Sequence, residues 1–426
     1  MSLQGTFNTS VQAMLSQSQM MQNISTNIAN TNTTGYKLQD SHFATLLNHT
    51  TPSGTGRPKS FFTVNTFDYR QVDKQGTIAT TNRTFDLAIN GRGFIVTNTL
   101  MDGSGEFQYT RDGALFGKAL DLGTDTDEDG QNDQGTLLTT AAGNFVFGWQ
   151  ADEAGNISES QDLKSLVPVT YSNNSVFPSK TTTEIKFQGN LSANATDRLN
   201  TSLPFVDQEG NSRSLTMGFT HSITGEWTLD MSAVNTANQP VDVIFDPPTL
   251  TFDGTGNLVT PTDGLINVEI GDSVGPQSLT IDIKKLSQFA DGNKLSVENV
   301  DHDGYQEGRL LNTYFNSHGM LIGSYSNGEL RNLFKLPIAT FAADGNLEAK
   351  SGSTFIERPE AGAMKLNSLG SPTGTTHIVT GALEASNVDL ADQFSKMIVT
   401  QRAYSSAAKC LSTADEMTQA ARDLKR

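Results

Sequence analysis

The sequence contains a single cysteine, Cys410, among 426 residues. One cysteine excludes an intramolecular disulfide and a thiolate metal cluster, and we expect it to be a small buried apolar residue. No apolar run approaches the ~20 residues of a membrane-spanning helix. The N-terminus also lacks the basic region and continuous apolar core of a secretory signal peptide. We therefore expect no membrane insertion and, if the chain is exported, export without a cleaved signal peptide.

Charge is scarce and mostly negative. Only 18% of residues are charged, and 46 Asp and Glu against 29 Lys and Arg give a net charge of −17. Such a surface would repel the phosphates of nucleic acid and of anionic lipid, so both are excluded as partners. The stretch from Met1 to Tyr36 has no Asp, Glu, Lys or Arg at all, and Lys37 is the first charged residue.

Catalytic motifs are missing. The six histidines form neither HxH nor HExxH, and there is no GxSxG elbow and no GxxxxGK[ST] loop. The GRGF segment at Gly91 lacks the third glycine and the following helix of a dinucleotide fingerprint. We predict no catalytic residues, no enzyme activity and no required cofactor.

One acidic loop resembles a calcium site. Asp125, Asp127 and Asp129 alternate, Gly130 follows, and Asp133 completes a DxDxDGxxD pattern whose oxygens could wrap a hard cation. Thr136 stands where an EF-hand has its bidentate Glu, and no helices are predicted beside the loop. Residues 125–133 are therefore a candidate calcium loop, with a solvated acidic hairpin tip as the alternative.

Apolar residues at helical spacing mark both chain ends. The N-terminal stripe is Phe7, Val11, Met14, Met21 and Ile28, and the C-terminal stripe is Leu390, Phe394, Met397, Tyr404 and Leu411. We expect Ser386 or Asn387 to cap the second helix, with Asp389 and Asp392 at the positive end of its dipole. Two interpretations stay open: amphipathic helices packed on a globular core, or a terminal pair forming its own coiled-coil-like unit.

The middle of the chain is predicted to be β. Turn signals recur every ~8–12 residues between short alternating segments, as in sandwiches and barrels. The strongest hairpin runs over 319–341, where Asn327-Gly328 favours a type I′ turn. The predicted fold class is therefore mixed, mainly β, with N- and C-terminal helices paired as a coiled-coil-like core domain and all-β domains nested between them.

Two segments resemble the signatures of the bacterial flagellar rod and hook proteins. NISTNIANTNTTGYK (23–37) is similar to the family's NNIANxNTxGFK signature, and SNVDLADQFSKMIVTQRAYSSAAKCLSTADEM (386–417) looks like the partner motif at the other end. Four inner segments also resemble the family in the expected order: FDLAINGRGFIVT (85–97), YTRDGALF (109–116), AAGNFVFGWQAD (141–152) and IGSYSNGE (322–329). Length and the YSNG hairpin favour a hook subunit over the shorter rod subunits. The matching residues are Asn27, Ile28, Ala29, Asn30, Asn32, Thr34, Gly35, Tyr36, Lys37, Asn387, Val388, Asp389, Gln401 and Arg402.

This resemblance implies a four-part architecture. Residues 1–37 and 382–426 would form a terminal helical core domain, and 38–72 and 361–381 an extended connector. Residues 73–164 and 288–360 would form an inner β domain, and 165–287 an outer β domain.

The resemblance also implies a function. Many copies would self-assemble into a curved tube, the flagellar hook, which works as a universal joint between rod and filament at the cell exterior. The implied partners are rod proteins at the proximal end, a hook cap during assembly, hook–filament junction proteins at the distal end and the type III export apparatus. The alternatives are a distal rod subunit, a hook–filament junction protein and a calcium-dependent secreted enzyme or adhesin.

The uncharged N-terminal stretch then has an interpretation. It would be a self-assembly helix packed beside many copies of itself, where any charge would be repeated and poorly screened. Asn30, Asn32 and Gly35 would form the elbow after the helix. Lys37 would mark the point where the chain leaves the crowded core and charge is tolerated again.

Overall fold

The structure is a computed structural model that describes residues 3–51, 59–121, 134–152, 154–172, 175–222, 226–235, 239–271, 275–370 and 376–423. Contacts divide the chain into two compact units. Unit 1 comprises Met1–Asn173, Thr313–Gly323 and Arg331–Arg426, and unit 2 comprises Asn174–Asn312 and Ser324–Leu330. The four-part division implied by the family resemblance is not tested by this grouping and stays a prediction.

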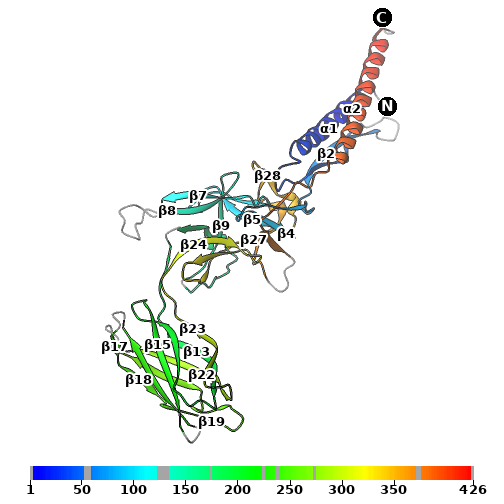
Figure 1. Cartoon of the computed structure of the whole chain (residues 1–426). Coiled ribbons are helices and arrows are strands. Elements are labelled where there is room, and N and C mark those ends of the chain that lie inside the picture. Colours follow the sequence, from blue (N-terminus) through cyan, green and yellow to red (C-terminus); the bar gives the residue numbers. More distant parts are fainter. Residues whose placement is uncertain are drawn as a thin grey trace. The chain divides into compact units, whose positions relative to one another are not determined.

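Two long helices at the chain ends lie side by side in unit 1 (Figure 1). Helix α1 spans Leu3–Ala29 and helix α2 spans Leu390–Asp423. Both also lie close to an antiparallel hairpin of β1 (Gln39–Thr51) and β2 (Lys59–Arg70), which follows α1 in sequence. The pairing of the terminal helices around inserted strands confirms the predicted fold class.

The remainder of unit 1 is β structure. A sheet runs in the order β26-β9-β5-β6-β29-β28, and β7, β8, β10, β11, β27 and β30 extend it. Two short antiparallel pairs, β3 with β32 and β4 with β31, join early and late parts of the chain. The strands are β3 (Ile78–Thr80), β4 (Leu87–Asn90), β5 (Phe94–Asn98), β6 (Phe107–Thr110), β7 (Leu115–Asp121), β8 (Gln134–Thr140), β9 (Phe145–Gln150), β10 (Val167–Pro168), β11 (Thr170–Ser172), β26 (Leu330–Lys335), β27 (Ile338–Thr340), β28 (Glu348–Lys350), β29 (Thr354–Ile356), β30 (Lys365–Asn367), β31 (His377–Thr380) and β32 (Ala382–Glu384), with 3-10 turns η1 (Leu163–Ser165), η2 (Asp344–Asn346) and η3 (Pro359–Ala361).

Unit 2 is a sandwich of two sheets. One sheet has the order β18-β21-β22-β13-β23, in which β13 and β22 are parallel, and the other has β14-β15-β16-β19-β20 with β17 beside β16. The strands are β13 (Glu184–Ser192), β14 (Leu199–Val206), β15 (Ser212–His221), β16 (Glu226–Val234), β17 (Pro240–Val241), β18 (Val243–Asp246), β19 (Thr249–Phe252), β20 (Leu258–Thr260), β21 (Leu265–Ile270), β22 (Gln277–Phe289) and β23 (Leu295–His302). Strands β12 (Val176–Phe177), β24 (Gly308–Phe315) and β25 (Met320–Tyr325) belong to neither sheet of the sandwich; they precede β26 in the order of the larger sheet.

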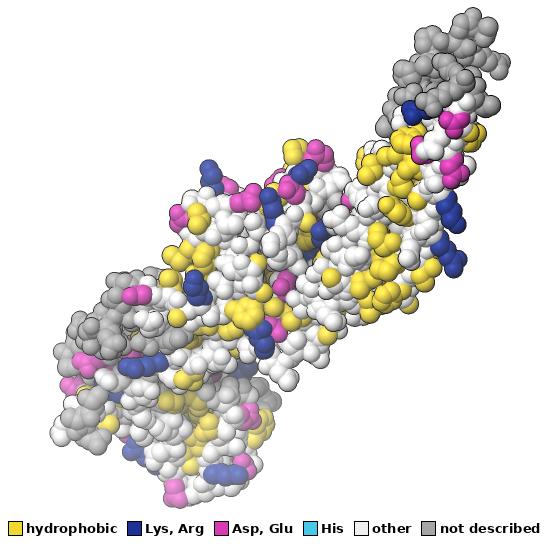
Figure 2. All heavy atoms as spheres, turned by 90° about the horizontal axis from the view of Figure 1, so that it is seen from above, with side chains coloured by type: hydrophobic (Ala, Val, Ile, Leu, Met, Phe, Trp, Pro, Cys, Tyr) yellow, Lys and Arg dark blue, Asp and Glu magenta, His cyan; other side chains and the backbone are white. Residues whose placement is uncertain are grey.

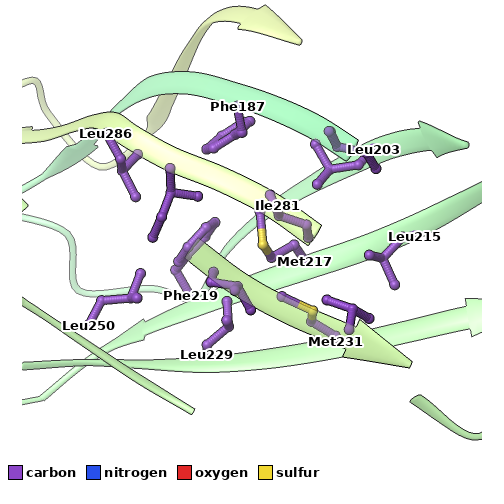
Figure 3. Packing of buried hydrophobic residues seen from close by; sticks show 14 of the residues in the cluster. Phe187, Leu203, Leu215, Met217, Phe219, Leu229, Met231, Leu250, Ile281 and Leu286 are labelled. Carbon is purple, nitrogen blue, oxygen red and sulfur yellow. The ribbon is translucent and has the colours of Figure 1, made fainter. Parts of the chain in front are cut away.

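Strict alternation along the strands builds the core of unit 2. In β16, Trp227, Leu229, Met231 and Ala233 are buried while the residues between them are exposed or half-buried. Successive strand residues point to opposite faces, so this pattern sends one apolar face inward. Phe187 and Phe219 from the two sheets meet at the centre with ring centroids 6.5 Å apart (Figure 3).

The hairpin turn after β25 differs from its prediction. Tyr325 N donates to Glu329 O, Gly328 N donates to Tyr325 O, and Gly328 has a φ of 86°. Asn327 does not have a positive φ, which a type I′ turn would require of it. The type I′ prediction was wrong because the loop has three residues and ends in a glycine bulge.

Candidate assembly surface and elbow on the terminal helices

Asn27 organises the end of α1. Its side chain is 1% exposed, and its Nδ2 donates to Gln39 O at 2.8 Å and to Gln393 Oε1 at 3.1 Å. Its Oδ1 accepts from Tyr36 Oη and from Gln39 N, both at 3.0 Å. A buried amide is stable only when its hydrogen bonds are satisfied, and this one ties α1, β1 and α2 together. Burial raises the pKa of Tyr36, which therefore stays a neutral donor.

The elbow itself is tightly packed. Asn30 Nδ2 donates to Thr26 O at 2.9 Å, and Thr33 Oγ1 donates to Asn30 Oδ1 at 3.1 Å, so Asn30 closes the last turn. Gly35 follows with a φ of 65°, and a Cβ there would lie 2.6 Å from Asp112 N. Only glycine combines this backbone conformation with so close an approach.

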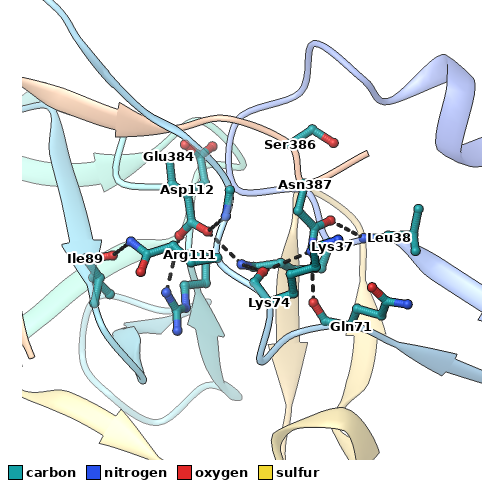
Figure 4. Close-up of polar contacts among 12 residues, drawn as sticks. Lys37, Leu38, Gln71, Lys74, Ile89, Arg111, Asp112, Glu384, Ser386 and Asn387 are labelled. Atoms are coloured by element: carbon teal, nitrogen blue, oxygen red, sulfur yellow. Dashed lines mark hydrogen bonds and ion pairs between the residues drawn. The ribbon is translucent and has the colours of Figure 1, made fainter. Parts of the chain in front are cut away.

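Lys37 is not a surface charge, and the interpretation that charge is tolerated there because the chain leaves the core was wrong. Its side chain is 1% exposed, and its Nζ lies 2.6 Å from Glu384 Oε1 and 2.8 Å from Lys74 O (Figure 4). Arg111 Nη1 approaches the other carboxylate oxygen of Glu384 at 3.3 Å. Burial lowers the pKa of Lys37, and the charge of Glu384 opposes that effect.

The cap of the second helix lies two or three residues later than predicted. Asp389 is the cap, because its Oδ1 accepts from Ala391 N at 2.8 Å and from Asp392 N at 3.3 Å. Asn387 instead holds the connector: Oδ1 accepts from Leu38 N at 2.7 Å, and Nδ2 donates to the carbonyl oxygens of Gln71 and Lys74. Ser386 Oγ bonds to Val388 N, so the predicted cap at Ser386 or Asn387 was wrong.

Asp112 binds the elbow after α1 and was not among the residues predicted from the sequence. Thr34 Oγ1 donates to Asp112 Oδ1 at 2.9 Å, which fixes the elbow to the loop after β6. Burial raises the pKa of Asp112, against the hydrogen bonds from Ala114 N and Thr34. The YTRDGALF segment around Asp112 carries the family resemblance and was the available signal.

The buried and exposed faces of the helix pair are unusual. Residues buried in the pair are mostly small or polar: Ser10, Ser16, Asn23, Ile24, Asn27, Gln393, Thr400 and Ala414. Large apolar side chains are exposed instead, among them Phe7, Leu15, Leu390, Phe394, Ile398, Val399, Tyr404 and Met417, with Phe394 at 51% and Val399 at 66%. Figure 2 shows hydrophobic side chains gathered over this part of unit 1. Exposed large apolar side chains gathered on one part of the molecule in this way indicate an interaction surface.

The remaining residues predicted from the sequence differ in their exposure. Val11, Met14, Met21, Ile28, Met397 and Leu411 are half-buried, whereas Ala29, Asn32, Gln401 and Arg402 are exposed. Cys410 is exposed on α2, so the prediction that it is buried was wrong. Polar contacts attach the helices to the hairpin: Asn23 Nδ2 donates to Ser41 Oγ and Asp68 Oδ1, and Lys396 Nζ lies 3.2 Å from Asp40 Oδ2.

Other kinds of site find little support in the described part of the chain. The candidate calcium residues Asp125, Asp127, Asp129 and Asp133 lie outside the described residues. No group of three or more His, Cys, Asp or Glu there could hold a metal ion, and no described helix is long and apolar enough to cross a membrane. A surface cavity of about 830 Å³ in unit 1 is lined mainly by polar residues, and Lys335 and Glu159 in its wall pair with each other at 2.6 Å.

Comparisons with known proteins agree with this geometry. Residues 379–424 match the family described as flagellar basal body rod FlgEFG protein C-terminal, and residues 175–305 match the flagellar basal body protein FlaE D2 domain. The flagellar hook protein FlgE of Rhizobium meliloti is 28% identical, with all of both chains covered. The hook proteins FlgE of Borreliella burgdorferi (28%, covering 93% of this chain and 94% of the relative) and Salmonella typhimurium (26%, covering 92% and 93%) are similar over nearly their full lengths.

A solved structure is also similar, but only loosely. The Helicobacter pylori flagellar hook protein FlgE2 matches 72% of this chain and 100% of its own, with 13% identity and a TM-score of 0.49.

Paired terminal helices with β domains inserted between them, together with the two family matches, make the chain similar to flagellar axial proteins. Among these proteins, it is similar to flagellar hook proteins over its full length.

Proposed function

We infer that this chain is a structural subunit of the flagellar hook, polymerising in many copies into a curved tube that transmits torque as a flexible joint. The observation that carries the proposal is the apolar face left uncovered on the helix pair, from Phe7 to Phe394 and Tyr404. Burying apolar surface contributes about 25 cal/mol per Å², so further copies covering this face would stabilise an assembly.

The absence of charge on α1 supports the same conclusion. In a polymer, each charge on an inner helix would recur in every neighbour, at short range and with little screening. A helix without Asp, Glu, Lys or Arg avoids that repulsion. Ser10 and Ser16 are small, polar and buried in the helix pair. We propose that such residues, unlike large interlocking apolar side chains, permit the small shifts between packed helices that a bending joint needs.

The proposed partners follow from a hook subunit's place in the flagellum. They are rod proteins at the proximal end, a cap during growth, hook–filament junction proteins at the distal end, and the type III export apparatus. The proposed location is the cell exterior, reached without a cleaved signal peptide, and the role is structural rather than enzymatic. A distal rod subunit is not favoured, because the full-length relatives are hook proteins.

Electron microscopy of the purified chain in salt tests the proposal. We expect curved tubes. Straight rods would favour the distal rod alternative, and monodisperse globular particles over a wide range of salt and protein concentration would contradict the proposal.

Calcium binding by residues 125–133 is a separate proposal that rests on the DxDxDGxxD pattern alone. Calorimetry of the chain with calcium, against an Asp127→Ala variant, is the test. Equal heats for both chains would rule it out.

A further inference from the structure

We propose that Glu384 is the positioning residue that fixes the direction in which the terminal helix pair leaves the strands of unit 1. The inference rests on the proposed function and deepens it, because a subunit can join a regular polymer only if its assembly helices are presented in one direction. Glu384 is the last residue of β32, five residues before the Asp389 cap of α2.

Glu384 joins four separate segments through one side chain and one carbonyl. Its Oε1 accepts from Lys37 Nζ at 2.6 Å and from Gly76 N at 2.8 Å, and its Oε2 faces Arg111 Nη1 at 3.3 Å. Its backbone oxygen accepts from Gly35 N at 2.8 Å. The chain leaving α1, the loop before β3, the loop after β6 and the approach to α2 therefore meet at one carboxylate (Figure 4).

Burial makes the ion pairs of Glu384 hard to replace. The side chains of Lys37, Arg111 and Glu384 are all at most 2% exposed. Water cannot replace a lost partner at such a site, so breaking a buried ion pair is far costlier than breaking a surface pair. Loss of Glu384 would remove the carboxylate that pairs with both Lys37 and Arg111, and the two cations would keep only the weaker influence of Asp73 and Asp344.

The backbone around Glu384 leaves no room for an alternative path. A Cβ at Gly76 would lie 2.0 Å from Ala385 O, and a Cβ at Gly35 would lie 2.6 Å from Asp112 N. Three residues beyond Glu384, Asn387 binds Leu38 N together with the carbonyl oxygens of Gln71 and Lys74. The exit of α1 and the entry to α2 are therefore fixed to each other and to the strands at the same point.

Pulsed electron paramagnetic resonance on the full-length monomer can measure this. One spin label goes on Cys410, which is exposed on α2, and the second on an Ala119→Cys substitution at an exposed position of β7. We expect one narrow distance distribution in the labelled parent, and a distribution at least twice as broad after Glu384→Gln. Glu348→Gln is the matched control, since Glu348 also pairs with two cations, Arg358 and Lys350, but at the surface of unit 1.

A second variant covers the case in which Glu384→Gln unfolds the helices, which circular dichroism would reveal. Lys37→Gln removes one cation and keeps the Glu384–Arg111 pair, so we expect full helix content with intermediate broadening. Distributions as narrow as the parent in a folded Glu384→Gln chain, or in Lys37→Gln, would overturn the proposal.

Assembly gives an independent readout. We expect Glu384→Gln to lower the yield of tubes at least tenfold, while Glu348→Gln leaves it unchanged. If the parent itself forms no tubes, the proposed function fails, but the distance measurement on monomers still decides the role of Glu384.

Discussion

The terminal helix pair and the sandwich of unit 2 place their side chains in opposite ways. The sandwich encloses a continuous apolar core in which Phe187, Phe219 and Trp227 are fully buried. The helix pair buries small and polar side chains and exposes Phe394 and Val399. The sandwich therefore completes its hydrophobic core within one chain, whereas the helix pair leaves an apolar face uncovered, the face that we propose further copies cover.

Deleting residues 1–30 should have the largest effect on this comparison. Without α1 the helix pair cannot form, so we expect no tubes in electron micrographs at any protein concentration that assembles the full chain. The sandwich core contains no residue of the deleted segment, so near-UV circular dichroism of Trp227 should be retained. Tubes formed by the truncated chain would contradict the assignment of assembly to the helices.

Phe219→Ala tests the sandwich from the other side. Phe219 is fully buried between the two sheets, and removing such a ring costs about 3–5 kcal/mol of unfolding free energy. Denaturant unfolding of unit 2 should report this loss. At temperatures where the variant is still folded, tube formation should be close to that of the parent, because the helix pair does not take part in this core. A large loss of assembly by a folded variant would show that the two regions are not independent.

Phe394→Asp should have little effect on the monomer and a large one on assembly. The side chain is half exposed on α2, so unfolding of the free chain should change little. In a packed polymer the carboxylate would be buried without a partner, which costs well over the ~1.4 kcal/mol that corresponds to a tenfold change in an equilibrium constant. The protein concentration needed for assembly, measured by light scattering, should rise more than about tenfold.

Two further variants sharpen this measurement. Met14→Asp places the charge on the half-buried face of α1 and should also block assembly. Ser395→Asp places the same charge at the neighbouring exposed position of α2 and is the control. Equal behaviour of Phe394→Asp and Ser395→Asp would mean that charge on α2, rather than loss of the apolar face, controls assembly.

The sequence predicted what depends on local periodicity. Spacing of apolar residues located both terminal helices, and alternation with turn signals identified the β middle. The elbow could not be predicted in the same way, because Lys37 owes its burial to Glu384, 347 residues further along the chain. Likewise, Asn387 has the residue type of a helix cap, but Leu38, Gln71 and Lys74 occupy its polar atoms. Long-range partners of this kind leave no periodic signal.

Acid titration should give the smallest effect and separates the two regions by their ionisable groups. Hydrogen bonds from Thr255 Oγ1 and from the Asn257 and Thr255 backbone lower the pKa of Asp253, at the β19–β20 turn, from 3.8 to about 2. A carboxyl whose pKa is depressed by folding stabilises the folded state above its unfolded pKa, and the contribution is lost as the pH falls through the folded value. The denaturation midpoint of unit 2 should therefore differ between the parent and Asp253→Asn above pH 4, and the two midpoints should converge toward pH 2.

Helix α1 carries no titratable side chain, so any acid response of the helix pair must come from α2 or the elbow. A difference between parent and Asp253→Asn that stays constant from pH 5 to pH 2 would show that ionisation of this turn does not stabilise the sandwich.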